Sequence, residues 1–246
     1  MLDHLTIRGT DLEASARFYT TVLATLDVGP PTHTDFGYEF GDFSVAAASD
    51  ANPATRGLHI GFTARSRAAV DAFFRAGVDA GFASDGDPGP RPQYTDDYYG
   101  GFLLDPDGNS IEAAHLSSLA DTIVDHAWLR VASVAESRAA YLAIADAAAL
   151  SLVADQPDLV RFRTRDGFTF TLLSDGRPVT ENVHLAFASP GSGLDPLHAF
   201  HTAALSAGWR DNGAPGERPE YHPGYLGAFA LDPDGHNIEL VDHQRG

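Results

Sequence analysis

Two stretches of this chain carry nearly the same sequence and decide its organisation. Residues 98–112 read YYGGFLLDPDGNSIE, and residues 225–239 read YLGAFALDPDGHNIE. They lie about half of the 246 residues apart, so the chain is a tandem duplication. A residue that recurs at the matched position of both halves is therefore better evidence of a role than a residue that occurs once.

The pattern around these stretches predicts the fold class. In each Asp-Pro-Asp-Gly turn the Pro sets φ and the Gly accepts a positive φ, which is typical of a hairpin. Leu5 and Ile7 alternate with polar residues as in a strand, and Asp11 is placed to cap the helix that follows. The order strand, helix, strands occurs twice in each half, with helices expected over 14–26, 66–77, 135–149 and 194–208 and loops over 86–92 and 213–223. We therefore expect an α+β fold of two tandem domains, 1–117 and 122–246, joined by a linker near 116–122, with paired βαβββ modules in each.

Composition excludes several classes of function. The chain has no cysteine and no lysine, which removes disulfides, thiolate nucleophiles, Schiff-base chemistry and the P-loop lysine. A formal charge of -18 disfavours binding to nucleic acid or anionic membranes. No apolar run approaches the roughly 20 residues of a membrane span, and the N-terminus lacks the features of a signal peptide. We expect a cytoplasmic protein, a monomer or homodimer, with a small-molecule partner.

Three matched pairs have the residue types of a metal site. His4 and His126 lie in the opening strand of each half, and His59 and His184 open the strand of each second module. Glu112 and Glu239 follow the two hairpin turns. Strand alternation places these side chains on the polar side of their sheets. Two imidazoles and one carboxylate hold a divalent metal and leave positions open for substrate or water.

With these matched residues the chain resembles the vicinal oxygen chelate superfamily of glyoxalase I, extradiol dioxygenases and bleomycin-resistance proteins. The most specific stretch is DNGAPGERPEYHPGY at 211–225, followed by the hairpin. The resemblance implies a curved mixed sheet of paired βαβββ modules around a metal-binding cleft. It implies iron, manganese, nickel or zinc as the metal, with ligands His4, His59 and Glu112, then His126, His184 and Glu239. Whether each cup closes within its half or is shared between halves stays open.

Other residues depart from, or add to, this pattern. The strands at 43–47 and 168–172 lack the second Glu that glyoxalase I usually supplies. His222 has the spacing of the His that extradiol dioxygenases place beside the metal ligands, although Phe229 replaces the Tyr that they add. The first half has Thr95 at the position of His222, so we expect the second half to be the more active one. The further candidates are catalytic Tyr98 and Tyr225, substrate-binding Arg91, Arg218 and Tyr221, and the cleft aromatics Trp128, Phe168 and Phe170. His115, His198, His201, His236 and His243 have no matched partner and are interpreted as surface or packing residues.

Two functions follow as alternatives. The first is a divalent-metal-dependent enzyme of the glyoxalase or dioxygenase type, a lyase, isomerase or dioxygenase acting on a small substrate with neighbouring oxygens. The second is a metal-free protein of the bleomycin-resistance type that sequesters a drug or metabolite, for which an acidic chain suits a cationic ligand.

Overall fold

The computed structural model describes residues 1–244 as four βαβββ modules. Module 1 contains β1 Leu2–Gly9, α1 Leu12–Leu23, β2 Thr32–Thr34, β3 Gly37–Phe40 and β4 Phe43–Ala47. Module 2 contains β5 His59–Thr63, α2 Arg67–Asp79, β6 Ser84–Pro90, β7 Tyr99–Leu104 and β8 Ser110–His115. Module 3 contains β9 Val124–Arg130, α3 Val134–Ile144, β10 Ser151–Gln156, β11 Leu159–Arg163 and β12 Thr169–Leu173. Module 4 contains β13 His184–Ala188, α4 Leu194–Ser206, β14 Arg210–Glu217, β15 Leu226–Leu231 and β16 Asn237–Asp242.

The α+β class and the modules are as the sequence predicts, but the end of α3 and the edges of the sheets differ from the expectation. The edge strands β2 and β10 were not predicted. The Asp11 carboxylate accepts a hydrogen bond from the backbone N–H of Ala14 and begins α1, as expected. Helix α3 ends at Ile144 instead of residue 149, and Ala149 has a positive φ of 51°. The predicted loops 86–92 and 213–223 are partly strands, because β6 and β14 lie at the edges of the sheets, where Pro and Gly are tolerated.

The strands form two eight-stranded mixed sheets, and each sheet combines one module from each half. The first sheet has the order β14-β15-β16-β13-β1-β4-β3-β2, so it joins modules 1 and 4. The second has the order β10-β11-β12-β9-β5-β8-β7-β6, so it joins modules 2 and 3. The joins are the antiparallel pairs β1 with β13 and β5 with β9. The halves are therefore connected to each other through backbone hydrogen bonds at the centre of both sheets.

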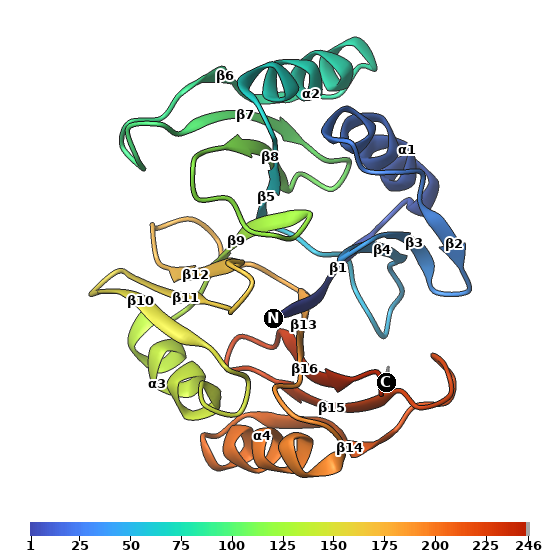
Figure 1. Cartoon of the computed structure of the whole chain (residues 1–246), viewed down its shortest axis with the longest axis vertical. Helices are drawn as coiled ribbons and strands as arrows, with labels where there is room; N and C mark the ends of the chain where they lie inside the picture. Colours follow the sequence, from blue (N-terminus) through green and yellow to red (C-terminus); the bar gives the residue numbers. More distant parts are fainter. Residues whose placement is uncertain (245–246) are drawn as a thin grey trace.

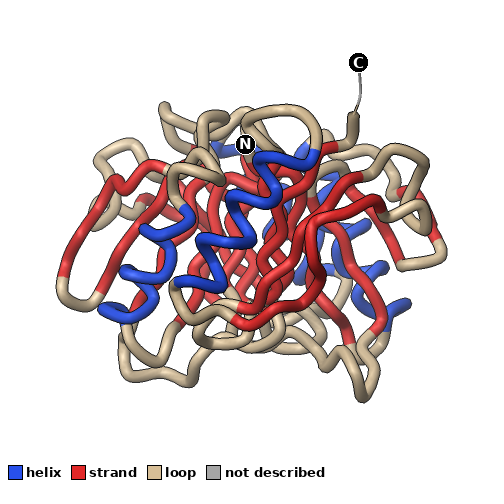
Figure 2. Tube along the Cα trace, turned by 90° about the horizontal axis from the view of Figure 1, so that it is seen from below, coloured by secondary structure: helices blue, strands red, loops and turns tan. Residues whose placement is uncertain are grey.

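Core packing connects the two modules of each half, whereas the sheets connect modules of different halves. In the first half Phe43 of module 1 meets Phe62 of module 2, with ring centroids 5.1 Å apart. In the second half Phe170 of module 3 meets Phe187 of module 4 at 5.6 Å. The helices lie on the outside of the strands (Figure 1), and the loops gather at the two ends of the molecule (Figure 2). The exact domain boundaries at 117 and 122 stay a prediction.

The repeated Asp-Pro-Asp-Gly turns also hold modules together. The first Asp of each turn accepts a hydrogen bond from a buried Tyr of the preceding module, Tyr19 to Asp105 at 2.9 Å and Tyr141 to Asp232 at 2.8 Å. The second Asp of each turn binds the loop before that module's helix; Asp234, for example, accepts from the backbone N–H of Ala132 at 3.0 Å. The motif is thus a tether between modules as well as a turn.

Candidate metal sites

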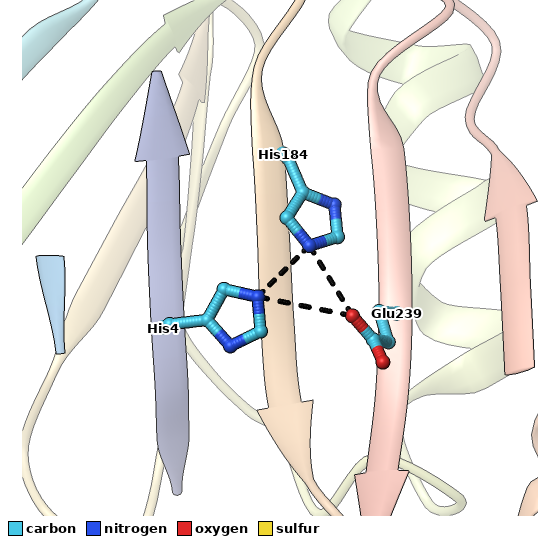
Figure 3. A group of neighbouring side chains, drawn as sticks. All are labelled: His4, His184 and Glu239. Carbon is cyan, nitrogen blue, oxygen red and sulfur yellow. Dashed lines mark hydrogen bonds and ion pairs between the residues drawn. The ribbon is translucent and has the colours of Figure 1, made fainter. Parts of the chain in front are cut away.

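The six predicted ligands form two clusters, each drawn from both halves. His4 of β1, His184 of β13 and Glu239 of β16 form one cluster, the cleft site, in which the three side chains point toward one another (Figure 3). The other three, His59, Glu112 and His126, lie together on β5, β8 and β9 and form the buried site. Within each cluster the possible ligand atoms lie within 4.8 Å of one another. The sequence left open whether the sites form within or between halves, and the structure forms them between halves. His4 joins two ligands of the second half and His126 joins two of the first, because each sheet contains one module from each half.

The cleft site brings two imidazole nitrogens face to face beside a carboxylate. His4 Nε2 lies 2.9 Å from His184 Nε2, and Glu239 Oε2 lies 3.2 Å from His184 Nε2 and 3.8 Å from His4 Nε2. His4 Nδ1 donates to Asp3 Oδ1 at 2.8 Å, so the neutral ring presents the lone pair of Nε2 to the cluster. His184 Nδ1 lies 2.8 Å from the side-chain amide nitrogen of Asn237 and 3.2 Å from the carbonyl oxygen of the same residue. In the tautomer that donates to the carbonyl oxygen, His184 presents its Nε2 lone pair as well.

The buried site repeats this arrangement with different supporting residues. Glu112 Oε2 lies 3.1 Å from His59 Nε2 and 3.3 Å from His126 Nε2, and the two nitrogens are 3.2 Å apart. His126 Nδ1 donates to Asp125 at 2.8 Å, and His59 Nδ1 lies 3.1 Å from Ser110 Oγ. Asp3 and Asp125 are thus a fourth matched pair, the residue before each opening His, which the repeat could have revealed.

Both clusters fit a cation. Two facing nitrogen lone pairs and a carboxylate repel one another unless a proton or a metal ion lies among them. Among residues 1–244, the buried Oε1 atom of Glu112 has no hydrogen-bond partner. Gly100 and Gly227, another matched pair, make room for the carboxylates, since a Cβ at either position would press on Glu112 or Glu239. The donor set and the space around it therefore suit a divalent ion with three protein ligands.

Without a metal, the buried site is an ion pair. Burial disfavours the charged form of Glu112, but hydrogen bonds and charges from His126 and His59 outweigh it and lower the pKa of Glu112 to about 2. Burial likewise opposes the charged form of His126, and Asp125 and Glu112 overcome it and raise the pKa of His126 to about 9. Burial prevails at His59, whose pKa is lowered. A metal ion bound here at neutral pH therefore displaces a proton from His126.

The two sites differ in access. The His4 side chain is 25% exposed, whereas His59 and His126 are 8% exposed. The cleft site opens into a cleft of about 900 Å³ that reaches Phe36, Tyr221 and His222. At the buried site Trp128 packs 5.0 Å from the His59 ring and meets Tyr94 edge to face. The matched position at the cleft site is Thr6, whose small side chain leaves the cleft open.

The predicted catalytic side chains gather around the clusters. Tyr225 donates to Glu239 Oε1 at 2.6 Å, and its match Tyr98 lies beside Glu112; burial first, and then the neighbouring carboxylate, raises the pKa of each phenol far above its usual value. His222 lines the cleft site, so it accompanies His4 and not His126. Its Nε2 lies 2.9 Å from His243 Nδ1.

His243 is more than the packing residue that the sequence indicates. Its Nε2 lies 2.9 Å from Asp3 Oδ2, and the other oxygen of Asp3 accepts from His4. A hydrogen-bonded chain of His222, His243, Asp3 and His4 therefore joins the cleft to a predicted ligand. Because the matched position in the first half is Leu116, the repeat gave no signal for His243.

Of the three predicted substrate-binding residues, Tyr221 lines the cleft, whereas Arg91 and Arg218 are not among its lining residues. Tyr221 lines the cleft and packs against Phe36 at 5.3 Å. Arg218 lies over the Phe229 ring and donates to the carbonyl oxygen of Ala214 at 2.6 Å. Arg91 does the same over Phe102 in the matched loop, donating to the carbonyl oxygen of Asp87. Phe168 and Phe170 are fully buried in the core, so the expectation that they line the cleft is wrong.

Comparison with known proteins gives a family match for the first 113 residues and a fold for the whole chain. A sequence model of the Glyoxalase/Bleomycin resistance protein/Dioxygenase superfamily matches residues 1–113. Curated protein sequences gave no match. Among solved structures, glyoxalase I from Zea mays has a TM-score of 0.70 at 19% identity, covering 98% of this chain and 92% of that chain. A candidate dioxygenase from Bacillus subtilis subsp. subtilis str. 168 has a TM-score of 0.64 at 15% identity, covering 100% of this chain and 86% of that chain. At these identities the structural likeness concerns the fold. No helix among residues 1–244 is long and apolar enough to cross a bilayer.

Proposed function

We propose that this chain, whose residues 1–113 match the Glyoxalase/Bleomycin resistance protein/Dioxygenase superfamily, is a divalent-metal-dependent enzyme acting on a small substrate with neighbouring oxygens. The observation that carries this proposal is the convergence of two imidazole nitrogens and a carboxylate oxygen within 4.8 Å, formed twice. Three protein ligands leave coordination positions for two substrate oxygens.

We further propose that the cleft site is the active one and that His4, His184 and Glu239 hold its metal. The 25% exposure of His4 and the adjoining cleft favour entry of a substrate there. Trp128 and Tyr94 pack against the buried site, which suits an ion with a structural role. When bound, the metal would supply Lewis-acid polarisation of the substrate oxygens.

The residues around the cleft site have complementary roles in this proposal. Tyr225 keeps its proton at neutral pH, since its pKa is raised by burial and by Glu239, so it acts as a hydrogen-bond donor beside the ligands. His222 stands in the cleft wall, where it can hold or release a proton near the substrate. His243 and Asp3 orient His222 and His4 through the hydrogen-bonded chain between them.

The sequestration alternative also has a supporting observation. The buried site contains the His126–Glu112 ion pair, so a proton on His126 can take the place of a metal ion among its ligand atoms. Phe36, Tyr221 and Tyr225 give the cleft an aromatic lining for a bound compound. This alternative predicts ligand binding that needs no metal and yields no product.

The test combines metal content with turnover. Protein purified without chelator or affinity tag is analysed by mass spectrometry and reconstituted with iron, manganese, nickel or zinc. It is then assayed on α-ketoaldehyde–thiol adducts and catechols. We expect His184→Ala to abolish turnover and His59→Ala, its matched control, to retain it. Absence of bound metal after reconstitution at neutral pH would refute the enzyme proposal and favour sequestration.

A further inference from the structure

Two positions behind one histidine of each site differ between the halves. In the second half they hold Asn212 and Asn237, next to the histidine that begins β13. In the first half the matched positions hold Asp85 and Ser110, next to the histidine that begins β5. A neutral imidazole carries one proton, and its Nε2 binds a metal only when that proton is on Nδ1. The group that faces Nδ1 therefore decides whether each ring can act as a ligand.

At the buried site this group holds His59 in the form that binds a metal. Ser110 Oγ donates its one proton to Asp85 Oδ2 at 2.6 Å. The same oxygen lies 3.1 Å from His59 Nδ1, where it can only accept, so Nδ1 carries the proton of the ring. The Nε2 lone pair of His59 therefore faces Glu112 and His126, as that of a metal ligand must.

At the cleft site the two asparagines select the other tautomer. Asn212 Nδ2 donates to Asn237 Oδ1 at 2.9 Å, which leaves the amide nitrogen of Asn237 facing His184. That nitrogen donates to His184 Nδ1 at 2.8 Å, whereas the carbonyl oxygen of Asn237 lies farther from Nδ1, at 3.2 Å. Because Nδ1 accepts with its lone pair, the proton of the neutral His184 ring is on Nε2.

The contact between the two histidines of the cleft site leads independently to the same tautomer. His4 Nδ1 donates to the Asp3 carboxylate, so Nε2 of the neutral His4 ring carries a lone pair. His184 Nε2 lies 2.9 Å from this nitrogen (Figure 3), and the contact is a hydrogen bond only if His184 Nε2 bears a proton. Two contacts on opposite sides of the His184 ring thus assign its proton to the same nitrogen.

We propose that Asn212 and Asn237 hold the empty cleft site in a form that cannot bind a metal, with the proton of His184 on Nε2. The inference rests on the proposed function in taking His184 as a metal ligand. Before the ring can bind, its Nε2–H bond breaks and an Nδ1–H bond forms through exchange with water. Nδ1 then donates to the carbonyl oxygen of Asn237, and the hydrogen bond from the Asn237 amide is lost. The two asparagines are therefore positioning residues that weaken metal binding at the cleft site.

Nuclear magnetic resonance of the metal-free full chain with nitrogen-15-labelled histidine tests the tautomer. The spectra are recorded at about pH 8.5, well above the ordinary histidine pKa of about 6.5. The His184 signals are identified by their loss in His184→Ala. We expect the proton of His184 on Nε2 in the wild-type protein. A proton on Nδ1 there would overturn the proposal.

Asn212→Asp should move the proton to Nδ1. The new carboxylate accepts from the Asn237 amide, so the amide turns its oxygen toward His184 Nδ1. Asn212 is exposed, and the two side chains have the same shape, so the fold should persist. Asp85→Asn, the reverse change at the matched position, should leave the His184 tautomer as in the wild-type protein. A proton that stays on Nε2 in Asn212→Asp would contradict the role of the two asparagines.

Metal titration by calorimetry measures the consequence in His59→Ala, where the cleft site alone keeps three ligands. Asn212→Asp in this background should raise metal affinity about 10- to 100-fold, the usual effect of residues that orient metal ligands. Adding Asn237→Ala separates this effect from the charge of the new carboxylate. Without an amide to turn, Asn212→Asp should leave the affinity unchanged, since an exposed charge is screened. An equal gain with and without the amide would overturn the proposal.

The two measurements separate this inference from the proposed function, because the tautomer is measured in metal-free protein. If His184 Nε2 carries the proton and no variant binds a metal, the metal-dependent function fails and the assignment of the proton stands. If the wild-type protein binds a metal and Nδ1 carries the proton, the inference fails and the function stands. Melting temperatures show whether each variant is folded.

Discussion

At the residue scale, the His and Glu residues that recur in both halves identified the candidate metal ligands, and the positions that differ between the halves distinguish the two sites. The six predicted ligands could be found because His4, His59 and Glu112 each recur in the second half. The residues that distinguish the two sites are those that do not recur, such as Thr6 at the cleft site against Trp128 at the buried site. His243 has no counterpart, and only the fold brings it to Asp3. A repeat therefore reveals what the two sites share and conceals what makes them different.

Tyr225 tests the support of the cleft-site carboxylate. Tyr225→Phe removes the 2.6 Å hydrogen bond to Glu239, which orients the carboxylate toward the two histidines. We expect the metal affinity of the cleft site to fall about 10- to 100-fold, as for other residues that orient metal ligands. Competitive titration with a coloured chelator measures this. Tyr98→Phe is the matched control and should weaken the buried site alone; an unchanged affinity in Tyr225→Phe would show that the hydroxyl does not orient Glu239.

At the element scale, local pattern predicted most strands and helices, and position in the sheet decided the exceptions. The segments containing β6 and β14 have the Gly and Pro content of loops. They are strands because each is an edge strand whose outer side needs no partner. Edge position is a property of the assembled sheet, so local composition could not predict it.

The hydrogen bond between Tyr141 of α3 and Asp232 of the second Asp-Pro-Asp-Gly turn gives a stability prediction. Tyr141→Phe leaves the buried Asp232 carboxyl without its phenol donor. We expect the free energy of unfolding to fall by about 1.5–3 kcal/mol, the contribution of a hydrogen bond to a charged group. Urea unfolding followed by circular dichroism measures it. Tyr38→Phe, which removes an exposed hydrogen bond to Glu13, should change stability by less than about 0.5 kcal/mol; equal effects in the two variants would contradict the tether.

The contact between the β3–β4 turn and the start of β9 predicts that stability depends on pH. Asp42 accepts hydrogen bonds from the backbone N–H groups of Ile123 and Val124, yet burial outweighs them and raises its pKa from 3.8 to about 6. Between these values the folded chain holds a proton on Asp42 that the unfolded chain has lost, so this contribution to stability declines as pH rises from about 4 through 6.

Asp42→Asn mimics the protonated side chain and should remove that decline. Relative to the wild-type protein, the variant should gain on the order of 2–3 kcal/mol between pH 4 and pH 7, since one pKa unit corresponds to about 1.4 kcal/mol. Unfolding curves at both pH values measure the gain. A stability difference between variant and wild type that is the same at pH 4 and pH 7 would contradict the raised pKa.

At the scale of the whole molecule, each of the two sheets contains one module from each half of the chain. Sheets join the halves, whereas core packing joins the modules within each half. The sequence predicted four modules and six ligands, but it could not show that β1 pairs with β13 and β5 with β9. Each module has the same pattern of polar and apolar faces, so either pairing buries the same surfaces. The choice between them depends on contacts distant in sequence.

The metal stoichiometry of two double variants of the full chain shows whether the two sites form between the halves. Each site takes ligands from both halves, so His4→Ala and Glu239→Ala should remove the same equivalent. The variant with both changes should then retain one of two equivalents. His4→Ala combined with Glu112→Ala, two changes within the first half, should remove both. Mass spectrometry of protein reconstituted at neutral pH gives the count. If instead the His4 and Glu112 pair leaves one equivalent and the His4 and Glu239 pair leaves none, each site forms within one half, which contradicts sites shared between the halves.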